Sequence, residues 1–271
     1  MCGIFGIAST KSIRNKLYQG LIKLEYRGYD SSGISGSDIS SKLTTIKATG
    51  PIKNLKTKLR LLTRITTGIA HTRWATHGEA ILKNTHPHLS ENISIVHNGI
   101  IENYIELKSL LKKKGYTFKS DTDSEVISHL IHMNYKKTRN MESSIISTTK
   151  MLKGSYAIGC INTNYANTIF AACKGSPLII GKGLNENFIA SDIMPILSDT
   201  KHYIPLDDDE FAKITPSKIS IFNAHKKTIS KKIKTSKINT QQASLSGHKH
   251  FMHKEIYEQK SILKEMTSRY V

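Results

Sequence analysis

The sequence predicts an α+β fold in which strands and helices are partly segregated along the chain. Short β-like segments separated by turn signals repeat between residues 155 and 222. Helical periodicity occurs earlier, over residues 13–24, 101–114 and 126–131. Such segregation favours antiparallel sheets over the regular strand–helix alternation of a parallel sheet. A length of 271 residues with 38% apolar residues is sufficient for a substantial core.

The first hundred residues alternate predicted strands and helical segments. An Ile- and Phe-rich start, residues 2–8, predicts a strand, and the helix that follows is expected to end at Gly28. Two further β-like segments, 43–48 and 65–71, flank an amphipathic segment. The strand predicted at 93–96 ends at Asn98-Gly99, a pair typical of a turn.

The helix predicted over 101–114 is followed by Gly115, the residue type common just after a helix end. Asp123 precedes the next helix and suits its N-cap. Six predicted strands then cover 156–161, 168–173, 178–181, 188–190, 211–214 and 219–222. We therefore expect one domain over residues 2–224, a basic and polar linker over 225–249, and a helical segment over 250–271.

Composition excludes several classes of protein. The net charge is +19, but the densest lysine cluster, residues 226–237, lacks interleaved aromatic residues for base stacking, so we expect no nucleic-acid partner. No apolar stretch approaches the ~18 residues that a membrane span needs, and the start has no basic region typical of a secretory signal. Three widely spaced cysteines indicate a reducing compartment, so we expect a cytoplasmic protein without membrane partners.

Cys2 is the first candidate for chemistry. An initiator Met before a small residue is commonly removed, which would leave Cys2 with both a thiol and a free α-amine. The reference pKa of such an amine is about 7.7–8.0 and that of a thiol about 8.5, so the amine can accept the thiol proton near neutrality. An N-terminal nucleophile with its own base results. The alternative interpretation is an ordinary terminal residue.

The opening Cys2-Gly3-Ile4-Phe5-Gly6-Ile7 resembles the start of class II glutamine amidotransferases. Longer motifs narrow the resemblance to the glutamine–fructose-6-phosphate aminotransferase family, over about residues 2–259. They are Leu24-Glu25-Tyr26-Arg27-Gly28-Tyr29-Asp30-Ser31-Ser32-Gly33, His71-Thr72-Arg73-Trp74-Ala75-Thr76-His77-Gly78, Val96-His97-Asn98-Gly99-Ile100-Ile101-Glu102-Asn103-Tyr104, Ser120-Asp121-Thr122-Asp123-Ser124-Glu125-Val126, Lys174-Gly175-Ser176-Pro177-Leu178 and Glu186-Asn187-Phe188-Ile189-Ala190-Ser191-Asp192.

This resemblance implies the N-terminal-nucleophile hydrolase fold, a four-layer αββα sandwich of antiparallel sheets. It also implies that Cys2 attacks the side-chain carboxamide of glutamine. Asn98 and Gly99 would stabilise the oxyanion through the side-chain amide and the backbone N–H. The alternative for these two residues is a plain hairpin turn.

Glutamine also carries an α-carboxylate and an α-ammonium. The resemblance implies that Arg73 binds the carboxylate, for which a guanidinium is well shaped, and that Asp123 pairs with the ammonium. The alternatives are a solvated loop arginine and a helix N-cap. Arg27 resembles the family's arginine near the cysteine. The loop that closes over glutamine in the family is represented here by Trp74, Thr76 and His77.

Histidines are dense at His86 and His88, and again at His248, His250 and His253. The first pair lies in a loop that resembles one in the same family, which uses no metal there, so we expect neither a metal nor a cofactor. Cys160 and Cys173 lie in apolar strands and are expected to be core residues.

The family continues past Lys254-Glu255-Ile256-Tyr257-Glu258-Gln259 into a sugar-isomerase half. This sequence has Lys260 where the family usually has Pro, and it ends at Val271. The resemblance implies hydrolysis of L-glutamine to glutamate and ammonia for amino-sugar synthesis, with the isomerase half and its fructose 6-phosphate site missing. A fragment, a split gene and a free-standing glutaminase remain open, as do a separate isomerase chain and a homodimer. The alternative is a non-catalytic glutamine-binding or docking remnant.

Overall fold

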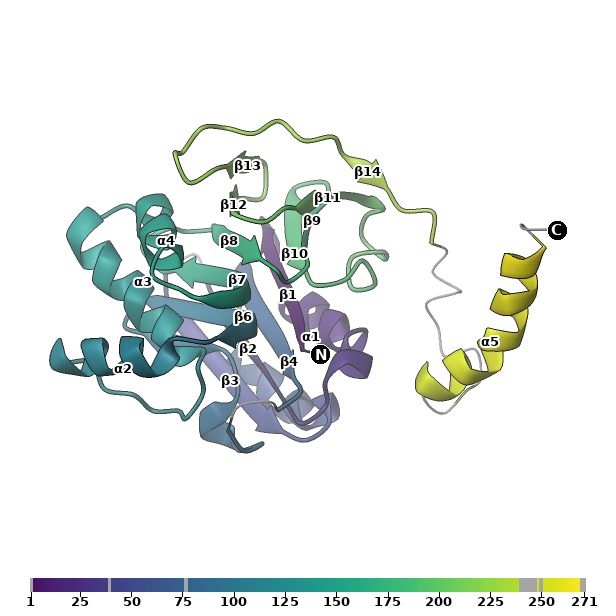
Figure 1. Ribbon diagram of the computed structural model, residues 1–271, viewed down its shortest axis with the longest axis horizontal. Coiled ribbons are helices and arrows are strands. Elements are labelled where there is room, and N and C mark those ends of the chain that lie inside the picture. The colour runs from purple at the N-terminus through teal and green to yellow at the C-terminus, as the bar shows by residue number, and fades with distance from the viewer. Residues whose placement is uncertain (1, 39, 76–77, 239–247, 249–250, 269–271) are drawn as a thin grey trace. The chain divides into compact units, whose positions relative to one another are not determined.

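The computed structural model describes residues 2–38, 40–75, 78–238, 248 and 251–268, without the side chains of 251, 252 and 265. The chain divides into two compact units, Met1–Ser236 and Lys237–Val271. The first unit contains both β-sheets and, of the helices that the structure describes, all except the last (Figure 1).

One sheet has eight antiparallel strands, and β1 lies in its interior. Glycine allows another segment to approach this sheet closely: a Cβ on Gly33 would lie 2.1 Å from the carbonyl oxygen of His86, which lies outside the sheet. In spatial order the strands are β14 (Lys234–Thr235), β11 (His202–Leu206), β9 (Leu178–Lys182), β10 (Glu186–Ala190), β1 (Gly3–Ser9), β4 (Thr67–Arg73), β2 (Ser31–Ser37) and β3 (Leu43–Thr49).

The second sheet has six antiparallel strands. Its longest pairing joins β6 to β7 from Ile93 opposite Asn162 through to Ile101 opposite Gly154. In spatial order the strands are β13 (Ile219–Phe222), β12 (Glu210–Ile214), β8 (Ile169–Lys174), β7 (Gly154–Asn162), β6 (Ile93–Ile101) and β5 (His88–Ser90).

The two sheets pack face to face. Alternate residues of β1 point to opposite sides, so that Ile4 and Ala8 join a core with Val96 and Ala157 of the other sheet, whereas Phe5 faces the helices. Fully burying an aliphatic side chain of this kind is worth about 1.5–3 kcal/mol. Hydrophobic burial on both faces of each sheet therefore holds the sandwich together.

Helices cover both outer faces. The outer face of the eight-stranded sheet is covered by α1 (Arg14–Ile22) and the 3₁₀ segment η2 (Ile52–Leu61). The outer face of the six-stranded sheet is covered by α2 (Tyr104–Lys113), α3 (Glu125–Thr138) and α4 (Met141–Thr149) (Figure 1). Short 3₁₀ turns lie at η1 (Glu25–Arg27) and η3 (Leu82–Asn84). This arrangement confirms the expected four-layer αββα sandwich.

Two local expectations were wrong at the site end of the sandwich. Asn98-Gly99 is not a turn, because β6 continues through both residues while pairing with β7. Asp123 is not the N-cap of α3: the N-cap residue is Ser124, and Asp123 instead accepts a hydrogen bond from the Ile101 N–H. In both cases the local sequence pattern misleads because the residue interacts with a strand that is distant in sequence.

The elements that were not anticipated from the sequence include α4 and the strands β2, β5, β11 and β14. The β2 sequence Ser31–Ser37 is rich in Ser and Gly, residue types with low strand propensity, yet all seven residues are buried. We attribute the small residues of β2 to the limited space between its neighbours rather than to strand propensity.

The first unit extends to Ser236, beyond the boundary expected at residue 224. Lys231 explains part of this, because its Nζ lies 2.7 Å from Asp207 and 2.6 Å from Glu210 of the sandwich. The short strand β14 then pairs with β11. The second unit contains α5 (Phe251–Thr267), in the region where a final helix was expected.

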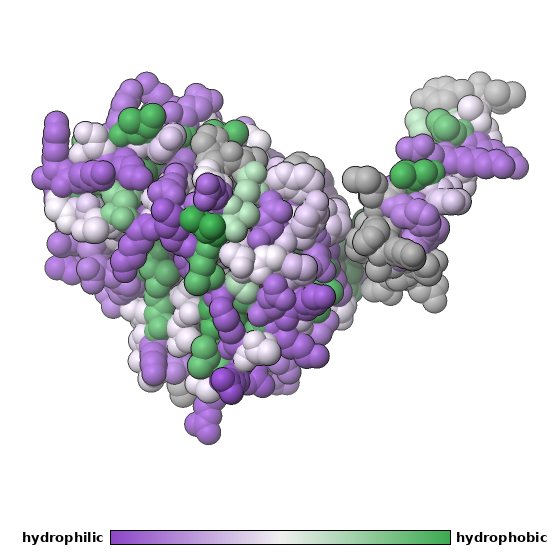
Figure 2. Space-filling model, turned by 90° about the horizontal axis from the view of Figure 1, so that it is seen from below, coloured by the Kyte–Doolittle hydropathy of each residue, from purple (hydrophilic) through white to green (hydrophobic). Residues whose placement is uncertain are grey.

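The surface of the sandwich is mainly hydrophilic on the face shown in Figure 2, with apolar side chains interspersed. Among the described residues, no helix combines the length and apolarity that crossing a membrane requires.

Candidate active site

Cys2 lies at the start of β1, where the eight-stranded sheet meets the loop after β4. Its Sγ accepts a hydrogen bond from the Trp74 N–H at 3.3 Å and lies 3.5 Å from the Trp74 carbonyl oxygen, to which the thiol can donate. Burial raises the pKa of the Cys2 thiol, although the Trp74 N–H opposes this. The thiol is therefore protonated near neutrality and needs a base before it can act as a nucleophile.

The carbonyl of Cys2 is held from two directions. Asn98, on β6 of the other sheet, donates from Nδ2 to this oxygen at 3.1 Å and to Ser191 Oγ at 3.0 Å. Arg27 donates to the same carbonyl from Nε at 3.1 Å, and its Nη1 lies 3.4 Å from the carboxylate of Asp192. These contacts fix the backbone of the cysteine to the six-stranded sheet through Asn98 and to the 3₁₀ turn that contains Arg27.

Gly99 occupies a position that only glycine fits. Its φ is +128°, and an added Cβ would lie 2.1 Å from the Ser155 carbonyl oxygen. The strand therefore passes Cys2 without any side chain at this point.

A small pocket opens beside the cysteine. Its volume is about 30 Å³, enough for one or two water molecules. The residues that line it are Cys2, Arg73, Trp74, His86, His97, Gly99, Thr122, Asp123 and Ser124.

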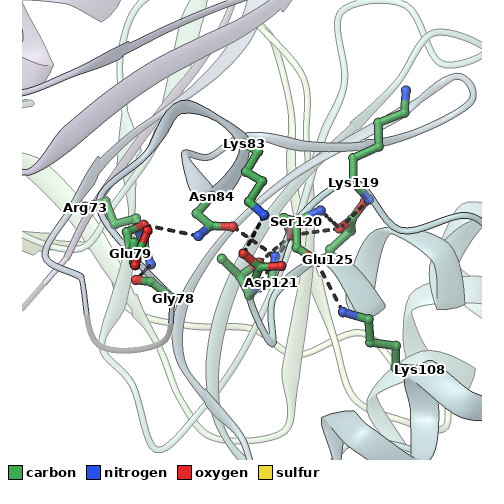
Figure 3. A network of polar contacts seen from close by, with 11 residues as sticks. Arg73, Gly78, Glu79, Lys83, Asn84, Lys108, Lys119, Ser120, Asp121 and Glu125 are labelled. Atoms are coloured by element: carbon green, nitrogen blue, oxygen red, sulfur yellow. Dashed lines mark hydrogen bonds and ion pairs between the residues drawn. The ribbon is translucent and has the colours of Figure 1, made fainter.

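Arg73 is buried at the end of β4 and holds the loop that follows it. Its Nη2 donates to the Gly78 carbonyl at 2.9 Å and its Nη1 to the Glu79 carbonyl at 3.0 Å. Asn84, fully buried, donates to the same Glu79 carbonyl and accepts from the Asp121 N–H at 2.9 Å (Figure 3). The loop after Arg73 is thus tied to the segment that carries Asp123.

The segment before α3 is itself rigidly held. The Glu125 carboxylate accepts from the backbone N–H groups of Lys119 and Ser120 and from Ser120 Oγ (Figure 3). Burial opposes ionisation of Glu125, but the nearby His129, whose Nε2 lies 3.6 Å from Oε1, and the hydrogen bonds from these groups outweigh it and lower its pKa to about 2. Asp123 lies two residues earlier, where Oδ2 accepts from Ile101 N–H at 2.8 Å and Oδ1 from Ser124 Oγ at 3.1 Å.

Four buried histidines gather at the pocket, namely His71, His86, His88 and His97, and two of them, His86 and His97, line it. The rings of His71 and His86 are 4.1 Å apart and those of His86 and His88 are 4.5 Å apart. Burial lowers the pKa of every one of them, to about 3 for His71. In the part of the chain that the structure describes, no group of three or more His, Cys, Asp or Glu side chains could hold a metal ion.

The structure brings together Cys2, Arg73, Asn98, Gly99 and Asp123 from three strands and one helix entry. Trp74 is 42% exposed and packs edge-on against Tyr29, while Thr76, His77 and His250 lie outside the described residues. Cys160 and Cys173 are buried.

Sequence reasoning missed His71, His97 and Ser191 at this site. His71 opens the motif that also contains Arg73, and Ser191 lies in the motif ending at Asp192. Their occurrence in these motifs was the sequence signal from which they could have been predicted as site residues. The contacts that define their place come from strands distant in sequence.

Comparison with protein families agrees with this geometry. A family profile described as "Glutamine amidotransferase domain" matches residues 71–198. The chain is 44% identical to the glutamine–fructose-6-phosphate aminotransferase (isomerizing) of Buchnera aphidicola subsp. Baizongia pistaciae over 97% of its length. It is 42% identical to the enzyme of the same name from Francisella tularensis subsp. tularensis over 96% of its length.

The chain contains a class II glutamine amidotransferase domain. It covers 44% and 43% of those two relatives, so it spans less than half of their length and corresponds to their amidotransferase half.

Solved structures support the same fold. Glutamine phosphoribosylpyrophosphate amidotransferase from B. subtilis, complexed with ADP and GMP, is 26% identical with a TM-score of 0.69; the match covers 82% of this chain and 49% of that one. A glutamine aminotransferase class-II domain protein from Silicibacter pomeroyi, 14% identical with a TM-score of 0.60, shares the fold over 82% of this chain and 99% of its own.

Proposed function

We propose that this chain hydrolyses the side-chain amide of glutamine to glutamate and ammonia, with Cys2 as the nucleophile. The observation that supports this most directly is the placement of Cys2, Arg73, Gly99 and Asp123 around one small pocket, with Asn98 hydrogen-bonded to the carbonyl of Cys2.

The base in this proposal is the α-amine of Cys2, freed by removal of Met1. Because burial raises the pKa of the thiol, the thiol does not ionise unaided near neutral pH. An α-amine has a reference pKa of about 7.7–8.0 and lies on the same residue, so it can take the thiol proton.

In the first step the Cys2 sulfur bonds to the amide carbon and the carbonyl oxygen becomes an oxyanion. The Cys2 amine then passes the proton to the nitrogen, the carbon–nitrogen bond breaks, and ammonia leaves a γ-glutamyl thioester. Water attacks the thioester, giving its proton to the amine and then to the thiolate. Glutamate leaves, and the thiol and the amine are regenerated.

Asn98 and Gly99 are the proposed oxyanion donors. Both hydrogens of the Asn98 amide are engaged, with the Cys2 carbonyl and with Ser191. To stabilise the oxyanion, Asn98 must therefore give up one of these hydrogen bonds and donate that hydrogen to the substrate.

Arg73 and Asp123 are the proposed partners of the α-carboxylate and the α-ammonium of glutamine. Arg73 is buried and lines the pocket, and its planar guanidinium is suited to bidentate binding of a carboxylate. A pocket of about 30 Å³ is too small for glutamine, so binding requires the lining to open. We assign the covering role to the loop with Trp74, Thr76 and His77.

The names of the relatives describe aminotransfer to fructose 6-phosphate with isomerisation. We propose that this chain supplies ammonia for such a reaction. We propose that fructose 6-phosphate binds in the part of the relatives that this chain does not match.

The test is glutamate release by the purified chain, with intact mass to establish the loss of Met1. Cys2→Ala is expected to abolish turnover while glutamine binding remains measurable by calorimetry. The matched control is Cys173→Ala, which removes a buried thiol from the core and is expected to keep turnover. A wild-type chain that binds glutamine without hydrolysing it would instead support the non-catalytic alternative, and substantial turnover by Cys2→Ala would contradict the assignment of the nucleophile.

A further inference from the structure

The side chain of Asn98 links the two sheets at the point where Cys2 lies. On one side its Nδ2 donates to the Cys2 carbonyl. On the other side its Oδ1 lies 3.0 Å from Nε2 of His71, on β4 of the opposite sheet. The amide is therefore held between two groups of the eight-stranded sheet, although Asn98 itself belongs to β6.

The direction of each of these hydrogen bonds is fixed by groups that can only accept. The Cys2 carbonyl has no hydrogen to give, so the nitrogen end of the Asn98 amide faces it. The oxygen end therefore faces His71. The second contact of His71 Nε2, at 3.0 Å, is the carbonyl of His97, which also only accepts. Both neighbours thus require a hydrogen on Nε2 of His71.

The environment of His71 favours one neutral form of its ring. The side chain is fully buried, and burial lowers its pKa to about 3. A neutral imidazole carries a single N–H, which Asn98 and His97 place on Nε2. Its Nδ1 is buried without a hydrogen-bond partner. The histidine therefore acts toward Asn98 as a donor that does not become charged at neutral pH.

An amide has nearly the same shape when its nitrogen and oxygen exchange places, so packing alone cannot choose its orientation. A flipped Asn98 would set an oxygen, rather than a donor, toward Cys2 and toward a developing oxyanion. We propose that His71 is a positioning residue for glutamine hydrolysis, because its Nε2–H holds the Asn98 amide with Nδ2 directed to Cys2. This inference rests on the proposed function, since it concerns the same reaction.

The test compares three substitutions that differ in where they present a donor. His71→Gln places an amide nitrogen near the position of Nε2, His71→Asn places one near Nδ1, and His71→Leu offers none. Loss of one oxyanion donor costs about 10²–10³-fold in kcat. We therefore expect kcat to fall at least about 10-fold in His71→Leu and in His71→Asn, and to stay within about 3-fold of the wild type in His71→Gln. KM should change little in all three variants. Thermal unfolding and alkylation of Cys2 by iodoacetamide establish that each variant is folded.

A double-mutant cycle separates positioning from a general structural role. In an Asn98→Ala background, His71→Leu has no amide left to orient, so we expect no further loss in kcat. An equal loss in both backgrounds, or equal activity of His71→Gln and His71→Asn, would overturn the proposal.

Nitrogen-15 NMR of the histidine rings in the wild-type chain tests the same geometry without any variant that has to fold. We expect His71 to be neutral at pH 7 with its proton on Nε2, and a proton on Nδ1 or a charged ring would overturn the proposal. A wild-type chain without glutaminase activity would defeat the proposed function and this inference with it. An active chain that tolerates His71→Leu would defeat this inference alone.

Discussion

Two hollows of the sandwich differ in size, lining and chemistry. The pocket beside Cys2 has a volume of about 30 Å³, and its polar lining includes the buried side chains of Arg73, His97 and Asp123. A cleft along α3 is larger, about 330 Å³, and its lining includes the exposed side chains of Lys114, Lys119 and Lys136.

The comparison teaches that volume alone does not locate chemistry in this molecule. Buried polar groups that converge from several strands are costly to arrange and therefore indicate a functional site. Exposed lysines around an open cleft are solvated and cost little. We expect substitutions at the Cys2 pocket to have large effects and matched substitutions at the cleft to have small ones.

The largest difference between the Cys2 pocket and the cleft is expected when a carboxylate in each is replaced by the matching amide. Asp123→Asn should weaken glutamine binding by about 2–5 kcal/mol, because it removes the charge that pairs with the substrate ammonium in a buried site. Its amide oxygen can still accept the Ile101 N–H, so the fold should persist. The matched change at the cleft, Glu91→Gln, should leave KM unchanged. Normal binding and turnover by Asp123→Asn would mean that Asp123 only joins the start of α3 to β6.

Asn98→Ala should lower kcat by about 10²–10³-fold with little change in KM, since it deletes one oxyanion donor. At the cleft, Tyr116→Phe removes a hydrogen bond to His132 and should leave kcat unaltered. Steady-state glutamate release measures both. A variant of Asn98 that loses stability but keeps its rate would show that the residue only joins the sheets.

The sequence predicted the core strands and the residues around Cys2 better than it predicted their surroundings. Strand periodicity is local, so segments such as 93–96 and 211–214 could be placed. Asn98-Gly99 looked like a turn because that signal is local too, whereas the pairing with β7 that extends the strand is not. The role of His71 depends on a partner 27 residues away in another sheet, which no local pattern reveals.

The buried histidines should make the fold labile to acid. Their pKa values are lowered in the folded state, so the unfolded chain binds more protons once the pH falls below about 6.5, and stability falls with it. Each such histidine contributes a slope of up to about 1.4 kcal/mol per pH unit. His86 has no hydrogen-bond partner on either ring nitrogen, so His86→Phe removes one titrating group at little structural cost.

Urea unfolding at pH 7 and pH 5 measures this effect. We expect His86→Phe to lose about 2 kcal/mol less than the wild type between these values, because one proton uptake is absent over about 1.5 pH units. The exposed His225→Gln is the control and should leave the slope unchanged. An unchanged slope in His86→Phe would show that His86 is not a source of the acid lability.

The smallest effects are expected from lysines of the cleft. Lys114 and Lys136 are exposed, and surface substitutions of this kind usually change stability by less than about 0.5 kcal/mol. The double variant Lys114→Ala/Lys136→Ala removes two charges from the cleft and leaves the lining of the Cys2 pocket intact. Its kcat and KM for glutamine should equal those of the wild type both at low salt and at physiological salt. Any electrostatic attraction of the substrate to the cleft would be least screened at low salt and more strongly screened at physiological salt. A fall in kcat/KM that disappears as salt is added would show that the cleft guides substrate to the reaction, and the contrast between the two hollows would then not hold.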